Sequence, residues 1–384
     1  MSYSIGATSA NMGPMGAIER FGQESGEPGA FDPRVAARLL GLLRPHWRRM
    51  AAALVLILAS SVLTLAAPYL IKVAIDESIA RGDQDAHFVR PRPSFQLSLR
   101  DADLFVSTGL DLELWVPPLL DAAGNRKILE GGPGYVSAWP GIEMLEVPTS
   151  ASRSEGDVHI YGNPHIHTDP LNMIFIARNI LAGLKKIDPD GSSFYEEREK
   201  ALEDRIYRRM FGDELAELLG GETLARLERS GNLRSFLAGK EFPRGSGRTL
   251  EGRLGGWLKQ AEPLRGRKII GYHKDWIYFA HRFGLEIAGY IEPKPGIPPT
   301  PRHVEEIISL IQGQKIRAIV CANYFDPAKP QAIADRTGAT VVMVPLSVGG
   351  EPGVEGYEQL IDTWISRLVA ALGKAPAGPG GRTP

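Results

Sequence analysis

The stretch KIIGYHKDWIYFAHRFGLEIAGYI, residues 268–291, decides the fold because it reads as a strand, a helix and a second strand. Lys268 to Tyr272 is an apolar run with the length of a buried strand. Asp275 to Phe283 has the pattern of a helix, which Gly284 closes, and Glu286 to Ile291 returns as a strand. This order predicts a right-handed crossover between two parallel strands.

The same alternation continues to the end of the region 265–373 and predicts an α/β lobe with a mostly parallel sheet. Ligands of such sheets bind beyond the carboxyl ends of the strands, and His273 lies at one of these ends. The further elements expected are strands at Ile316 to Cys321 and Thr340 to Val344, and helices at Val304 to Gln312, Pro330 to Arg336 and Tyr357 to Leu372.

Residues 84–190 also mix strand-like and helix-like segments, with a strand at Asp103 to Gly109 and a helix at Leu171 to Lys186. Residues 191–264 are charged and helical in pattern. The sequence therefore predicts an α/β protein of two Rossmann-like lobes, 84–190 and 265–373, joined by a helical linker and insertion at 191–264.

Three histidines, His87, His165 and His273, each stand where a strand or tight turn meets a helix. Neutral imidazole is the commonest protein ligand for zinc, and three imidazoles with a water or carboxylate complete a tetrahedral shell. Ligands so far apart in sequence converge only if two lobes fold against each other. We therefore expect a zinc site between the lobes. His167 alternates with His165 and would point to the opposite face of an extended segment, so it is considered as a neighbour of the site and not as a ligand.

Several short motifs stand in a fixed order between Asp85 and about Leu372. They are Asp85-Ala86-His87, Ala102-Asp103-Leu104-Phe105, Asn163-Pro164-His165, Asp169-Pro170, Tyr272-His273, Tyr278-Phe279, Phe283-Gly284-Leu285, Gly296-Ile297-Pro298-Pro299-Thr300-Pro301 and Thr337-Gly338-Ala339. In these motifs the chain resembles the periplasmic metal-binding proteins of zinc and manganese ABC importers, the cluster with a rigid helical linker. The resemblance implies capture of a metal ion by His87, His165 and His273 and its delivery to an importer permease, without catalysis.

Manganese-selective members carry carboxylate ligands, one of them near Pro345, whereas Pro345 and Ala322 cannot bind a metal. Three imidazoles without an obvious carboxylate favour Zn²⁺, with Mn²⁺ less favoured. The fourth position is left to water, Asp85, Asp326 or Glu351.

Residues 51–71 contain no charged side chain and have the length of a membrane-spanning helix. Arg44, Arg48 and Arg49 precede them, which predicts a cytoplasmic N-terminus and an exported body, anchored to the membrane and located in the periplasm. The range 31–83 resembles the first transmembrane helix of exporter-type ABC transporters.

The family's usual strand–helix–strand unit before the first histidine is missing, so we expect a truncated first lobe and a junction near Gly82 to Gln84 that marks a fusion or a mis-joined gene. Residues 1–30 and 374–384 are rich in small and polar residues or proline, and we expect them to be disordered.

Composition excludes several other classes. The formal net charge is −1, which gives no footprint for nucleic acid, and the single cysteine, Cys321, rules out a thiolate zinc site. Two alternatives stay open: a three-histidine zinc hydrolase, although no HExxH motif is present, and an exporter fragment fused to a non-functional binding-protein remnant.

Overall fold

The computed structural model describes residues 92–148, 160–293 and 298–373. The chain divides into two compact units, 1–74 and 75–384, and the first lies wholly outside the described residues. The predicted membrane segment 51–71, the predicted tails and His87 also lie outside them. None of the helices in the described part is long and apolar enough to cross a bilayer.

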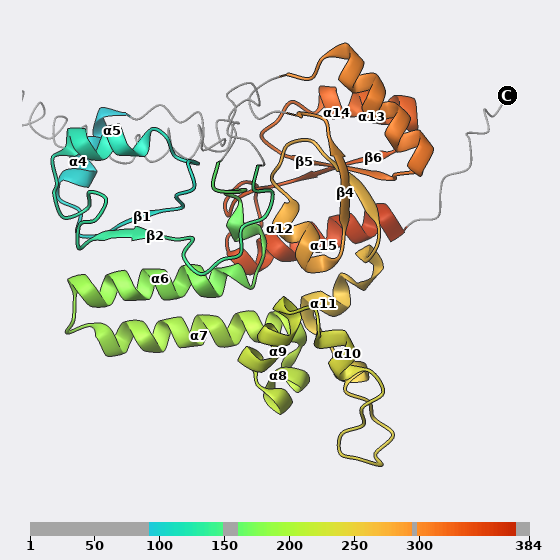
Figure 1. Ribbon diagram of the computed structural model, residues 1–384, viewed down its shortest axis with the longest axis horizontal. Coiled ribbons are helices and arrows are strands. Elements are labelled where there is room, and N and C mark those ends of the chain that lie inside the picture. Colours follow the sequence, from blue (N-terminus) through green and yellow to red (C-terminus); the bar gives the residue numbers. More distant parts are fainter. Residues whose placement is uncertain (1–91, 149–159, 294–297, 374–384) are drawn as a thin grey trace, which may run out of the picture. The chain divides into compact units, whose positions relative to one another are not determined.

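The second lobe is a four-stranded parallel sheet in the order β4-β3-β5-β6, with helices on both faces (Figure 1). The strands and helices expected there are all present, with ends displaced by a few residues at most. They are β3 (Lys268–Gly271), α12 (Ile277–Phe283), β4 (Glu286–Tyr290), α13 (Pro301–Gln314), β5 (Ala318–Ala322), α14 (Ala328–Thr337), β6 (Thr340–Val344) and α15 (Tyr357–Gly373).

The central strand β5 is buried along its whole length, as expected of a strand covered on both faces. Its residues alternate between two hydrophobic clusters because successive side chains of a strand point to opposite faces. Val320 packs in one cluster with Trp364 of α15, and Cys321 packs in the other with Ile307 of α13. Cys321 is thus a core residue, as its apolar surroundings in the sequence predicted.

The described part of the first lobe contains a two-stranded parallel sheet, in which Phe105 pairs with Tyr135. A small core of Val116, Leu120 and Ile128 packs against Phe105 and Tyr135 of this sheet. The elements are α4 (Pro93–Arg100), β1 (Phe105–Ser107), α5 (Val116–Ala123), β2 (Tyr135–Ser137), the 3-10 turn η4 (Ile166–Thr168) and α6 (Asn172–Ile187).

A run of helices links the two lobes, as predicted. Helices α6 and α7 lie side by side, and α7 also packs on α11 (Figure 1). The linker elements are α7 (Ser192–Phe211), α8 (Asp213–Leu219), α9 (Gly221–Arg229), α10 (Leu233–Leu237), η5 (Glu251–Arg253), α11 (Gly256–Gln260) and η6 (Glu262–Leu264).

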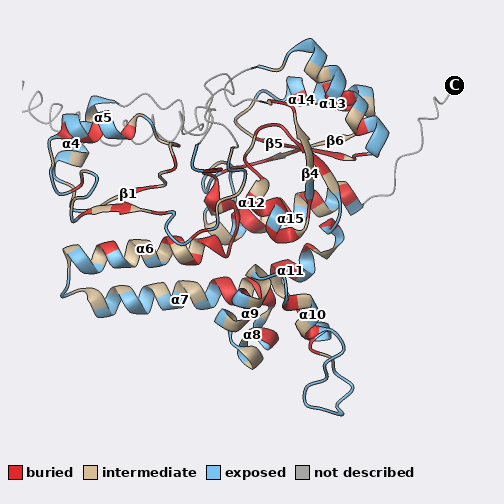
Figure 2. Ribbon diagram, in the orientation of Figure 1, coloured by how far each residue is buried: buried red, intermediate tan, exposed pale blue. Residues whose placement is uncertain are grey.

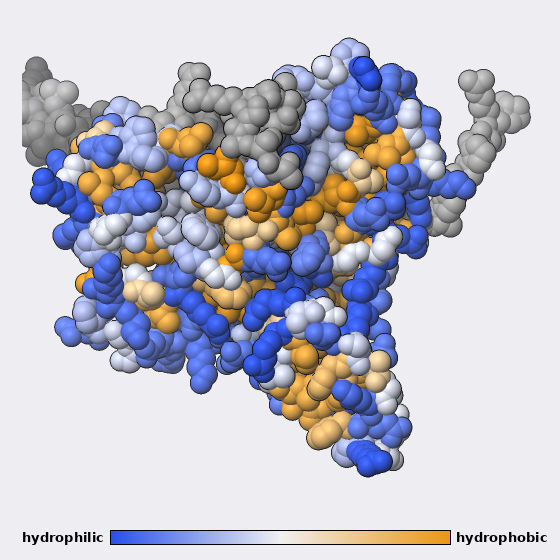
Figure 3. All heavy atoms as spheres, viewed as in Figure 1, coloured by the Kyte–Doolittle hydropathy of each residue, from blue (hydrophilic) through white to orange (hydrophobic). Residues whose placement is uncertain are grey.

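The largest hydrophobic cluster extends from the linker into the second lobe, so these two parts share one core. Trp257 of α11 and Trp364 of α15 are both completely buried in it. Figure 2 shows the buried residues concentrated where the linker helices meet the second lobe. On the face drawn in Figure 3, hydrophobic residues are exposed only in patches between hydrophilic ones.

A buried ion pair ties the segment before α6 to the second lobe. The Arg282 guanidinium donates from Nε to Asp169 Oδ1 at 2.9 Å and from Nη2 to Asp169 Oδ2 at 2.8 Å. Arg282 is 5% exposed and Asp169 2% exposed. Glu228 of the linker lies 3.5 Å from Arg282 Nη1, so this guanidinium contacts all three parts of the chain.

Candidate metal centre

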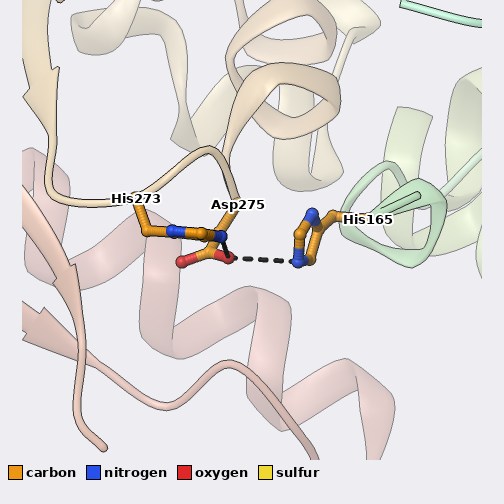
Figure 4. A group of neighbouring side chains, drawn as sticks. All are labelled: His165, His273 and Asp275. Carbon is orange, nitrogen blue, oxygen red and sulfur yellow. Dashed lines mark ion pairs between the residues drawn. The ribbon is translucent and has the colours of Figure 1, made fainter. Parts of the chain in front are cut away.

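His165, His273 and Asp275 come together in the interior of the protein, although more than a hundred residues of sequence separate His165 from the other two. One potential ligand atom of each lies within 4.8 Å of those of the other two. Figure 4 shows His165 approaching from the first lobe and the other two side chains from the second. All three residues are buried.

His273 and Asp275 stand in the turn between β3 and α12, beyond the carboxyl end of a parallel strand. This is the position at which such sheets bind their ligands. The residues on either side of the turn, Tyr272 and Trp276, are buried, and Trp276 packs edge-on against Trp364. The turn is therefore held by the core of the second lobe, and it presents two potential ligands from positions that one residue separates.

A second carboxylate orients the His273 imidazole. Glu292 stands just after β4, and its Oε2 lies 2.7 Å from His273 Nδ1. The ring nitrogen donates a hydrogen bond to this carboxylate. His273 Nε2 lies 4.0 Å from Asp275 Oδ1. A carboxylate behind a metal-binding histidine fixes its tautomer and increases its basicity.

His165 lies on the loop that leads into η4, and the side chain of Asn163 holds it. Asn163 Oδ1 accepts hydrogen bonds from the His165 backbone N–H at 2.9 Å and from His165 Nδ1 at 3.0 Å. The loop requires Gly162, whose φ is +117° and whose Cβ, if present, would meet Met144 Cβ at 3.0 Å.

The remaining nitrogen of His165, Nε2, lies 3.1 Å from Asp275 Oδ1. His273 Nε2 faces the same oxygen, so two imidazole nitrogens and one carboxylate oxygen converge at this point. Such an arrangement is stable when a cation or a proton lies between the donors. Two imidazole nitrogens and one carboxylate oxygen suit zinc, which takes nitrogen and oxygen ligands at about 2.0–2.2 Å.

The structure thus brings together two of the three predicted ligands, and the third, His87, lies outside the described residues, as does Asp85. The other carboxylates considered from the sequence serve elsewhere. Asp326 Oδ1 accepts from the backbone N–H of Ala328, and Glu351 forms an ion pair with Arg367.

Asp275 was not among the carboxylates considered for the fourth position, yet it is the one that the structure groups with His165 and His273. The signal was present in the sequence, because Asp275 is only two positions from His273. Two side chains two positions apart lie on the same face of a strand and point in different directions on a helix. In a turn, this spacing does not determine where the side chains point.

His167 lies beside the cluster, with its ring centroid 6.4 Å from that of His165. Its Nε2 is 3.4 Å from the carbonyl oxygen of Leu346, and it is not one of the grouped ligand atoms. Burial lowers the pKa of His167, against a smaller opposing effect of that hydrogen bond. The ring therefore favours the neutral form and packs behind the site.

Comparison with known proteins agrees with this geometry. The family model of zinc-uptake complex component A, periplasmic, matches residues 71–208 and 254–371, well over half of the chain. The interruption covers α8 to α10. The match begins at residue 71, inside the range 31–83 expected to resemble an exporter helix, and neither the family model nor the relatives described below support that resemblance.

Among curated relatives, the high-affinity zinc uptake system protein ZnuA of Brucella suis is 24% identical over 211 residues, which cover 55% of this chain and 50% of that protein. The iron-binding protein YfeA of Yersinia pestis is 23% identical over 309 residues, 79% of this chain and 80% of that protein. The chain thus spans about half the length of the Brucella relative.

A crystal structure of ZnuA superimposes with a TM-score of 0.52 over 76% of this chain and 88% of that chain, at 19% sequence identity. This likeness supports the α/β fold with its helical linker. Together with the family match, it leads to one conclusion: the chain belongs to the family of the periplasmic zinc-uptake complex component A.

Proposed function

We propose that this protein captures Zn²⁺ between its two lobes in the periplasm and delivers it to the permease of an ABC importer. The observation that carries the proposal is the convergence of His165 with His273 and Asp275, which come from different lobes, on one buried point. A metal bound there would join the lobes. Separation of the lobes would move His165 away from His273 and Asp275 and so weaken metal binding. Capture and release then need only ligand exchange.

The donor set argues for zinc as the cargo. His165 Nε2, His273 Nε2 and a carboxylate oxygen of Asp275 form a mixed nitrogen and oxygen set, and His87 would add a third imidazole. Imidazole-rich sites favour zinc, whereas manganese prefers oxygen. The single oxygen of Asp275 reduces the preference of this donor set for zinc over manganese but does not reverse it.

The family is one of uptake components, which argues against the zinc hydrolase considered from the sequence. The buried carboxylate of Asp275 lies against both imidazoles, at 3.1 Å from His165 Nε2 and 4.0 Å from His273 Nε2. At these distances it acts as a ligand to the metal rather than as a general base toward a bound water.

Calorimetric titration of the full-length protein with Zn²⁺ and with Mn²⁺, in parallel with a His165→Ala variant, tests the proposal. We expect one tight zinc site, weaker manganese binding, and loss of the tight site in the variant. A folded protein that binds neither metal would refute the proposed function.

We propose further that residues 51–71 anchor the protein to the membrane, with the lobes on the periplasmic side. The support is their lack of charge together with Arg44, Arg48 and Arg49 before them. Alkaline extraction of membranes tests this point, because an anchored protein stays in the membrane pellet and a peripheral one is released.

A further inference from the structure

The side chain of Asn163 bonds to both halves of the metal centre. Its oxygen holds the His165 backbone and imidazole, as described above. Its nitrogen donates to the carbonyl oxygen of Lys274 at 2.6 Å and to Glu146 Oε2 at 2.8 Å. All four hydrogen-bonding positions of the amide are therefore used, and Asn163 is only 4% exposed.

Lys274 is the residue between His273 and Asp275, so Asn163 bonds to the turn that carries both second-lobe ligands. One amide group thus spans the distance from the first-lobe ligand to the second-lobe pair. A hydrogen bond at each end fixes where the His165 ring stands relative to that turn.

Two tyrosines of the second lobe extend the same contact. Tyr278 of α12 donates its hydroxyl to the carbonyl oxygen of Asn163 at 2.8 Å. Tyr290 of β4 donates to Glu146 Oε1 at 2.6 Å, and Glu146 in turn accepts from Asn163. Both hydroxyl groups donate from the second lobe to the first. One bond ends at Asn163, and the other ends at Glu146, which accepts from Asn163.

We propose that Asn163 is a positioning residue that couples zinc occupancy to the contact between the lobes. The inference rests on the proposed zinc function of the site. If the lobes separate, the bond from Asn163 Nδ2 to Lys274 and the approach of His165 to Asp275 are lost together. Because coupling is reciprocal, zinc strengthens the lobe contact, and the lobe contact strengthens zinc binding. We expect this gain in affinity to appear mainly as slower release of zinc.

Two substitutions separate coupling from simple orientation of His165. Asn163→Asp keeps an oxygen acceptor for His165 but has no N–H for the Lys274 carbonyl and places a carboxylate against Glu146. Asn163→Ala removes both functions. Asn179→Ala is the matched control, because Asn179 Nδ2 donates to the carbonyls of Ala138 and Pro140 within the first lobe, at 2.9 Å each.

The measurement is the rate at which zinc-loaded full-length protein releases zinc to excess chelator in stopped flow, with the melting temperature of each metal-free protein alongside. We expect Asn163→Asp and Asn163→Ala to release zinc at least about tenfold faster than the unaltered protein, since loss of the bond to Lys274 alone corresponds to roughly that factor. Asn179→Ala should release zinc within about twofold of the unaltered protein even if it melts earlier.

Release from Asn163→Asp at the unaltered rate would overturn the coupling, because it would mean that the amide only orients His165. If Asn163→Ala does not fold, the comparison of Asn163→Asp with Asn179→Ala decides alone. An unaltered protein that holds no zinc would refute the proposed function and the coupling with it, whereas tight zinc with unchanged release from Asn163→Asp refutes the coupling only.

Discussion

The two lobes contribute to the metal centre in different ways. The second lobe supplies His273 and Asp275 from one turn at the end of β3, fixed by a four-stranded sheet and the large core shared with the linker. The described first lobe has a two-stranded sheet and supplies His165 from a loop. Packing therefore holds the turn that carries the second-lobe residues, and Glu292 orients the His273 ring, whereas the first lobe holds His165 by hydrogen bonds and by its contacts with the other lobe.

The largest expected effect concerns the buried ion pair of Arg282 and Asp169, which joins the second lobe to the segment before α6. Arg282→Ala would leave the Asp169 carboxylate buried without its guanidinium. We expect the free energy of unfolding to fall by about 3–5 kcal/mol, the usual loss when one partner of a buried pair is removed. Urea denaturation of the metal-free protein measures it, and a loss below about 1 kcal/mol would mean that the segment before α6 is held by other contacts.

Removal of a ligand from each lobe sharpens the comparison. We expect His165→Ala and Asp275→Ala each to weaken zinc binding by more than the roughly 10–100-fold that follows loss of an orienting residue. The metal-free Asp275→Ala protein should fold normally, because the turn is held by Trp276 and its packing. Competition with a chromogenic chelator gives the affinities, and an unchanged affinity in Asp275→Ala would remove the carboxylate from the ligand set.

A smaller loss is expected behind His273. Glu292→Gln keeps the size of the side chain but replaces the carboxylate that accepts from His273 Nδ1. Zinc affinity should fall about 10–100-fold because the imidazole becomes less basic and less well oriented. Glu286→Gln, on the exposed start of β4, is the matched control and should leave affinity unchanged; equal losses in both variants would contradict the orienting role.

The smallest effect is that of pH. Zinc displaces protons from its histidine ligands, so affinity must fall as pH falls. Because protons compete with zinc for two imidazole nitrogens, we expect a weaker zinc affinity at about pH 6.0 than at about pH 7.5. Calorimetry at the two pH values measures it, and His165→Ala should show a shallower dependence. A zinc affinity independent of pH would argue against imidazole ligands.

The second lobe could be predicted almost element by element from the sequence. Its strands are short apolar runs and its helices end at recognisable signals, such as Gly284, which adopts the left-handed conformation at the end of α12. The parallel topology also predicted that candidate ligands would lie beyond the carboxyl ends of the strands. His273 does lie just beyond the end of β3. Local pattern and global fold agree in this lobe.

The site was less predictable, because its details depend on side-chain direction and on contacts distant in sequence. The direction of Asp275 is a property of a turn, where no periodicity operates. The bond between Asn163 and Lys274 joins residues more than a hundred positions apart, and no local pattern signals it. Glu292 likewise reaches His273 only because β3 and β4 are adjacent.

The convergence of both lobes on one zinc ion is the central claim, and a crystal structure of the zinc-loaded protein with anomalous diffraction at the zinc edge tests it most directly. We predict one zinc ion bound by His165 Nε2, His273 Nε2 and an Asp275 oxygen, at about 2.0–2.2 Å. A zinc ion bound to residues of one lobe alone, or at another place, would contradict the account.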